Sequence, residues 1–278
     1  MDIKVSGIQG VPITESTPTD GQVLTYIGAN SDWEPKTSVN APGFNDVTKT
    51  GFREDFLNFL ANTNVTSEIA VGCDTGWLAN RIVGTGGSNS SVNFGSSTFA
   101  NPGTISVGWG NPISSGDGTV LYKASGDGTT FGILGANSPW EADFIFAVNG
   151  NTDVCIRVGF CDQGDQTADP SADGFWVRYD TSAGDTKFTW ETRHSSVSTV
   201  SVTNSINVDA NFHHFKIRSV VSGTVGFSVD GGTEYTTTSH VPPSQDMIMF
   251  LQDVSRGTQG FQSLLVDFVS YFATPGRA

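Results

Sequence analysis

Two carboxylates separated by a single residue are the first candidates for chemistry in this chain. Glu141 and Asp143 lie in the run 140–148, where apolar and polar residues alternate. Alternate positions of a β-strand share one face, so both carboxylates would point the same way. Glycoside hydrolysis uses such a pair, one as nucleophile or base and the other as acid. The plainer interpretation is that both form the solvent side of an alternating strand.

An aspartate-rich stretch at 161–174 is the second candidate site. Asp162, Asp165 and Asp169, followed by Asp173, lie between two predicted strands. Carboxylate and carbonyl oxygens in such a loop are ligands that Ca²⁺ accepts in irregular geometry, although the spacing lacks an EF-hand pattern. Calcium is therefore the one candidate cofactor, with an ordinary solvated acidic loop as the alternative.

Two tryptophans are candidates for stacking on sugar rings. Trp176 and Trp190 lie in alternating runs, and an indole is large enough to cover the apolar face of a pyranose. Their parity along the strands does not say which face either ring occupies. Burial in the core is the alternative for each.

The histidines and cysteines indicate neither a catalytic nor a metal site. His213 and His214 are adjacent in a predicted strand, so they point to opposite faces and cannot jointly hold one metal without distortion; we expect one to pack and the other to face solvent. Cys73, Cys155 and Cys161 are odd in number and lack a C-x-x-C spacing, so we interpret them as buried small apolar residues. No catalytic residue is predicted.

Charge and hydropathy exclude several kinds of partner. With 14 Lys plus Arg against 28 Asp plus Glu, the formal net charge is −14, which predicts repulsion from nucleic acids and from anionic membranes. The longest apolar run, 263–272, is too short for a membrane span and is interrupted by Asp267. The start of the chain, 1–7, lacks the basic and apolar regions of a signal peptide, so we expect synthesis and folding in a cytoplasm.

Short alternating runs predict an all-β fold for most of the chain. Turn residues such as Asn149-Gly150, Ala183-Gly184, Ser222-Gly223 and Asp230-Gly231-Gly232 separate them. The predicted strands are 140–148, 155–160, 175–179, 188–191, 197–202, 212–218, 224–230, 234–238, 247–251 and 264–272. Many short strands without intervening helical patterns predict an antiparallel β-sandwich or jelly roll. Only 51–62 could form a helix, and a strand fits it nearly as well.

Residues 1–45 have a different composition from 46–278. Glycine and proline recur at short intervals, and the apolar residues between them follow no regular period, so this segment cannot close a core alone. We expect an extended segment that buries Val23, Leu24, Tyr26 and Trp33 against other chains. A glycine- and proline-rich linker with ordinary exposed apolar residues is the alternative.

Two stretches resemble known families. Residues 10–13, 18–26 and 33–35 (GVPI, PTDGQVLTY and WEP) resemble the collar or neck segment of bacteriophage tail fibres and other virion fibres. That resemblance implies a homotrimer, in which three copies pool their apolar residues. Residues 101–105, 140–144, 158–160, 172–180 and 211–217 are similar to concanavalin-like jelly-roll domains of phage structural proteins. This second resemblance implies a lectin-like head at 46–278, without fixing a sugar specificity.

Together the resemblances imply a virion structural protein, located in the virion after synthesis in the host. Its neck would attach to other virion proteins, and its head would bind a host-surface glycan or decorate the particle. The first alternative is a carbohydrate-binding lectin module of a bacterial adhesin, which the missing secretion signal disfavours. The second is a glycoside hydrolase. Laminarinase-like sandwiches carry Glu-x-Asp-x-x-Glu, but the last position is Phe146 here, which removes one of three carboxylates.

Overall fold

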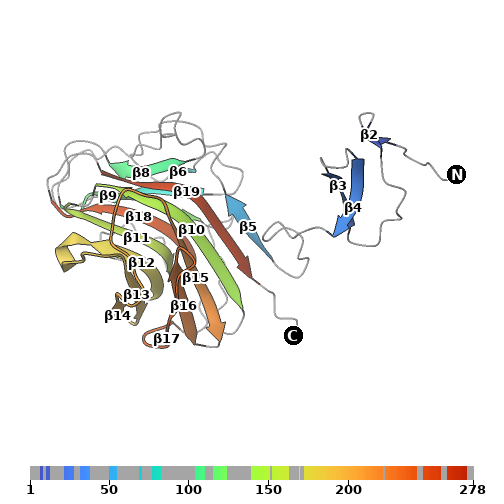
Figure 1. The fold of residues 1–278 in the computed structure, drawn as a ribbon. Helices are drawn as coiled ribbons and strands as arrows, with labels where there is room; N and C mark the ends of the chain where they lie inside the picture. The colour runs from blue at the N-terminus through green and yellow to red at the C-terminus, as the bar shows by residue number, and fades with distance from the viewer. Residues whose placement is uncertain are drawn as a thin grey trace. The chain divides into compact units, whose positions relative to one another are not determined.

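The computed structural model divides the chain into two compact units, residues 1–49 and 50–278 (Figure 1). The change in composition along the sequence predicts a boundary after residue 45. The structure describes residues 7–8, 11–12, 22–27, 32–37, 50–54, 69–70, 77–82, 104–109, 115–123, 139–150, 152–162, 169, 172–221, 223–242, 247–257 and 262–273. No helix in these ranges is long and apolar enough to span a membrane.

The first unit contains two short antiparallel strand pairs. Strand β1 (Gly7–Ile8) pairs with β2 (Val11–Pro12), and β3 (Gln22–Ile27) pairs with β4 (Asp32–Thr37). The register of the second pair places Tyr26 opposite Trp33 and Leu24 opposite Pro35. Three of the proposed oligomerisation residues, Val23, Leu24 and Tyr26, therefore lie on β3, and Trp33 lies on β4 opposite Tyr26.

The second unit is an antiparallel β-sandwich, as predicted. One sheet has seven strands within the described residues, in the order β17-β16-β15-β10-β19-β5, with β8 also paired to β19. Its strands are β5 (Thr50–Glu54), β8 (Ile105–Trp109), β10 (Trp140–Asn149), β15 (His213–Val221), β16 (Thr224–Val229), β17 (Tyr235–Thr237) and β19 (Gln262–Ala273). Figure 1 shows this sheet layered on the other.

The other sheet has eight strands within the described residues, in the order β14-β13-β12-β11-β18-β9-β7-β6. Its strands are β6 (Ile69–Ala70), β7 (Trp77–Ile82), β9 (Gly118–Lys123), β11 (Val154–Cys161), β12 (Gly174–Asp180), β13 (Thr189–His194), β14 (Val197–Ser201) and β18 (Ile248–Ser255). A single 3₁₀ turn, η1 (Thr181–Ala183), follows β12 and is the one helical element of the described residues.

The core lies between the two sheets and is rich in aromatic rings. Phe146 stacks on Phe215 with centroids 4.4 Å apart, and Trp190 stacks on Phe227 at 5.4 Å. The first pair joins β10 and β15, neighbouring strands of the seven-stranded sheet, and the second joins β13 of one sheet to β16 of the other. Each fully buried ring removes roughly 150–250 Å² of surface from water. Burial of these rings is the main force that holds the two sheets face to face.

A second apolar cluster covers the outer face of the eight-stranded sheet. It includes Cys155, Cys161, Trp176 and Phe250, all buried. Both faces of β11 and β18 are therefore buried, so apolar residues occupy both faces of each strand. The interpretation of the cysteines as buried residues is confirmed for Cys155 and Cys161, whereas Cys73 lies outside the described residues.

Turn chemistry and strand positions agree with the sequence. Gly150, Gly184, Gly223 and Gly231 all have positive φ angles at predicted turns, a region that favours glycine. In the ambiguous run 51–62, residues 50–54 form strand β5, and the positions after 54 lie outside the described residues. The strand alternative is thus confirmed for the start of this run.

Candidate functional site

A mixed polar and aromatic surface crosses the centre of the seven-stranded sheet on its outer face. The inner-facing residues of β10, Ala142, Phe144 and Phe146, are buried in the core. Glu141 and Asp143 alternate with them and are partly exposed, which confirms that both lie on the solvent side of an alternating strand.

Cross-strand register builds this surface from three strands. The β10 patch, as we call it, has two rows in which a residue of β10 lies between one from β19 and one from β15. The first row is Phe272, Glu141 and Arg218. The second row is Ser270, Asp143 and Lys216. A third set, Phe268, Ile145 and His214, continues the same face. Apart from buried Ser270, every residue of the patch is at least partly exposed.

Asp143 is the polar centre of the β10 patch. Its Oδ1 atom lies 2.7 Å from His214 Nε2 and 3.5 Å from Lys216 Nζ, and its Oδ2 atom accepts a hydrogen bond from Ser270 Oγ at 3.3 Å. Burial raises the pKa of Asp143, but the His214 hydrogen bond and the Lys216 charge outweigh burial, so the pKa lies below its ordinary value. The carboxyl group is therefore ionised at neutral pH.

Lys216 connects the two carboxylates of the patch. Its Nζ atom lies 3.6 Å from Glu141 Oε2 as well as 3.5 Å from Asp143 Oδ1. In the neighbouring row, Arg218 donates to both carboxylate oxygens of Glu234, at 2.6 and 2.8 Å. Donors and acceptors are thus fixed in position on a surface flanked by the rings of Phe268 and Phe272.

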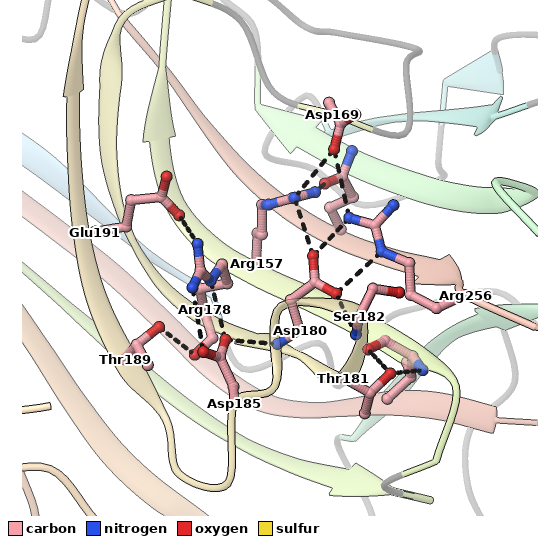
Figure 2. Close-up of polar contacts among 12 residues, drawn as sticks. Arg157, Asp169, Arg178, Asp180, Thr181, Ser182, Asp185, Thr189, Glu191 and Arg256 are labelled. Carbon is pink, nitrogen blue, oxygen red and sulfur yellow. Dashed lines mark hydrogen bonds and ion pairs between the residues drawn. The ribbon is translucent and has the colours of Figure 1, made fainter. Parts of the chain in front are cut away.

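A buried network of ion pairs lies on the outer face of the other sheet (Figure 2). Asp180, at the end of β12, lies between two guanidinium groups: Arg256 donates to both of its oxygens, at 3.1 and 2.6 Å, and Arg157 Nη2 lies 3.7 Å away. Burial raises the pKa of Asp180, but the hydrogen bonds and the charge of Arg256 outweigh burial, so the pKa lies below its ordinary value. Asp180 also caps η1 by accepting from the backbone N–H of Ser182.

Arg178 organises the other half of this network. It donates to Glu191 at 2.8 Å and to both oxygens of Asp185, at 3.0 and 3.1 Å. Figure 2 shows Arg178 between these two carboxylates. Every one of these contacts pairs opposite charges, which is the condition under which buried ions are tolerated.

The structure places neither tryptophan candidate on the surface. Trp176 is 0% exposed and donates its indole N–H to Glu191, while Trp190 is 1% exposed, lies between the sheets and donates to the Thr203 carbonyl. Neither ring can stack on a sugar in this conformation, so both glycan-binding candidates are corrected to the buried alternative. Gly174 makes room for the Trp176 ring, because a Cβ at residue 174 would lie 2.4 Å from Trp176 Cζ3.

The structure describes two of the three aspartates of the calcium candidate, Asp162 and Asp169, so calcium binding stays a prediction. Asp169 Oδ1 lies 3.5 Å from Arg157 Nη2 and 3.4 Å from Arg256 Nη2. The backbone N–H of Asp162 donates to the Asp173 carbonyl, and Asp165 lies outside the described residues. Among described residues, no group of three or more His, Cys, Asp and Glu side chains could hold a metal ion.

The adjacent histidines divide as expected. His213 packs edge-on against Phe188 and Phe215 at the border of the core, and His214 points to the outer face with 44% of its side chain exposed. His213 also contacts Asp209 and Asp230, at 3.0 and 2.7 Å. Burial lowers the pKa of His213, but these two carboxylates outweigh burial and raise it above its ordinary value.

The surface aromatics of the β10 patch were missed by sequence reasoning. Phe268 and Phe272 share a face with Ser270, whereas Val269 and Tyr271 point into the core. In the run 264–272, aromatic residues occur at both even and odd positions, so alternation alone does not tell which face of the strand is buried. The pairing of Phe272 with Glu141 across β10 and β19 is the signal that identifies the outer face.

No protein-family model matches this chain, and no curated protein sequence matches it. Among solved structures, a prokaryotic β-1,3-1,4-glucanase (lichenase) from a mouse hindgut metagenome is 15% identical with a TM-score of 0.49, covering 80% of this chain and 98% of its own. The CBM2 module of the evolved Dit of Lactobacillus casei BL23 phage J-1 is 13% identical, with a TM-score of 0.46 and coverages of 83% and 98%. Peanut lectin is 12% identical, with a TM-score of 0.44 and coverages of 81% and 97%.

Proposed function

We propose that this chain is a virion appendage protein whose sandwich binds a host-surface glycan without cleaving it, through the β10 patch. The observation that carries the glycan part is the placement of partly exposed Phe268 and Phe272 beside ionised Asp143 and the cations Lys216 and Arg218. The virion part rests on the sequence resemblance of residues 10–35 to fibre necks.

Sugars match such a surface chemically. A pyranose has an apolar face that packs on an aromatic ring and a rim of hydroxyl groups that both donate and accept hydrogen bonds. Phe272 supplies the ring, Asp143 and Glu141 supply acceptors, and Lys216 supplies a donor. Because these polar groups already hold one another, little side-chain entropy is lost when a ligand binds.

The same contacts argue against hydrolysis. A glycosidase of this type needs one protonated carboxyl group as acid and one carboxylate free to attack or to activate water. The lowered pKa of Asp143 keeps it ionised, and three donors surround its oxygens. The position three residues further along β10 is Phe146, which is buried in the core.

The first test measures glycan binding and turnover together. Purified full-length protein is applied to a printed array of bacterial envelope oligosaccharides, and each glycan bound is then tested for release of reducing ends. We expect binding without release, and we expect Phe272→Ala and Lys216→Met each to weaken binding at least tenfold.

The matched control is Val200→Ala on β14, an exposed apolar residue of the other sheet. It should leave binding unchanged, and thermal melting should show that all three variants remain folded. Binding that survives both patch substitutions would refute this site, and release of reducing sugar would establish a hydrolase instead.

The proposed neck makes a separate prediction about oligomeric state. Three copies would raise the avidity of weak heads, because the second and third contacts become intramolecular. Light scattering on a sizing column should give three times the 29.4 kDa chain mass for the full-length protein, and less for a variant lacking residues 1–45. A monomeric full-length protein would exclude the trimeric neck.

A further inference from the structure

We infer that Arg157 and Arg256 form a second binding site, for a carboxylate-bearing ligand, in which Asp169 occupies the ligand's place. Asp169 connects the two guanidinium groups from the loop between β11 and β12 (Figure 2). This site lies on the opposite sheet from the β10 patch and does not depend on it.

Asp169 differs from every other acid of the network in exposure and in contact length. Its side chain is 77% exposed, whereas those of Asp180, Asp185 and Glu191 are at most 9% exposed. Its contacts with the two arginines are 3.4 and 3.5 Å long, whereas Arg256 holds Asp180 at 2.6 Å. Exposed, long ion pairs contribute little to stability, so Asp169 is the member most easily displaced.

The arginines are built for a stronger contact than Asp169 makes. Arg157 is fixed by donating its Nη1 to Gln252 at 2.8 Å, and Arg256 is fixed by two bonds to Asp180. Their Nη2 atoms converge on one oxygen, Asp169 Oδ1. The arginine side chains are 5% and 14% exposed, so a ligand oxygen there would meet two oriented, largely desolvated donors.

Local charge favours an anion despite the acidic chain. Two guanidinium groups share one buried carboxylate, Asp180, and the second negative charge comes from exposed Asp169. A carboxylate ligand that displaces the Asp169 side chain restores the same negative charge beside the two guanidinium groups. At physiological salt the repulsion from distant acids is screened beyond about 8 Å. If the proposed function holds, the natural ligand is a uronate residue of an acidic polysaccharide.

Removing the tethered carboxylate tests this inference directly. Titrations of wild-type protein, Asp169→Ala and Asp169→Asn with sodium glucuronate are followed by NMR, with glucose and sodium acetate as comparison probes. Because the intramolecular competitor is gone, both variants should bind glucuronate about tenfold more tightly than wild type. Glucose should show no such gain.

Asp209→Asn is the matched control, because it removes one exposed negative charge near the other sheet's β15. It should leave glucuronate affinity at the wild-type value. Equal affinity of the Asp169 variants and wild type would overturn the site, as would an equal gain in Asp209→Asn. A gain for acetate as large as that for glucuronate would retain the carboxylate site and refute recognition of the sugar ring. The glucuronate titration does not depend on whether Phe272→Ala and Lys216→Met lose binding to the glycan array, because those residues lie on the other sheet.

Discussion

Individual residues of this chain act mainly through charge pairing, and Asp180 is the clearest case. Asparagine at 180 would leave Arg256 without its buried counter-charge while the volume stays the same. We expect Asp180→Asn to lower the free energy of unfolding by about 3 kcal/mol. Urea denaturation at neutral pH would measure this loss. Asp209→Asn is the control and should cost much less, because the Asp209 carboxylate is exposed and its ion pair is screened by solvent.

His213 should make stability depend on pH. Its pKa is raised above 6.5 in the folded protein, so the stabilisation from Asp209 and Asp230 is complete below the unfolded pKa and is lost as pH rises through the folded one. We expect wild-type protein to lose stability as the pH rises above 6.5, through the raised pKa of His213, and His213→Asn to lose less. Identical pH profiles of the two proteins in urea denaturation would contradict this.

Sequence reasoning at this scale succeeded only where strand parity was informative. The solvent side of β10 and the opposite orientations of His213 and His214 follow from alternation with buried neighbours. The contact of Asp169 with Arg256 does not follow from alternation, because these residues are distant in the chain and a loop positions Asp169. The face of Trp176 was also hidden, since nearly every residue of β12 is buried.

At the scale of elements, close approach between β11 and β12 is the most constrained feature. Gly159 lies opposite Trp176, and a Cβ there would lie 2.5 Å from the Phe175 carbonyl oxygen. Backbone atoms cannot move aside cheaply, so Gly159→Ala should cost about 3 kcal/mol. Gly232→Ala, whose Cβ would come no closer than 3.0 Å to the Val229 carbonyl oxygen, is the control and should cost less. Similar urea midpoints would disprove the steric argument.

Most elements were predictable because the chain alternates between apolar and polar residues and marks its turns with glycine. Strands β10, β15 and β16 have one buried face and a partly exposed one, which produces a clear two-residue period. The residues of β5 were ambiguous because Phe52 fits a helical stripe and a strand equally well. Pairing with β19, a partner more than 200 residues away, selects the strand.

At the scale of the molecule, the sandwich class follows from the number of short strands, but the strand order does not. Strand β10 lies between β15 and β19, and β11 lies between β12 and β18. These neighbours are chosen by long-range packing of rings such as Phe146 on Phe215. Folds with so many non-local pairings form slowly, because loop-closure entropy must be overcome before the contacts stabilise the chain.

Strand β19 has a consequence for how the protein is made. It comes last among the described strands, yet it lies inside the seven-stranded sheet and pairs with β10, β5 and β8. While the ribosome is still synthesising residues 262–273, these three strands have no common neighbour and the sheet stays open. The sandwich therefore closes only after residues 262–273 have left the ribosome, and a chain truncated before residue 262 would expose strand edges that are prone to aggregate.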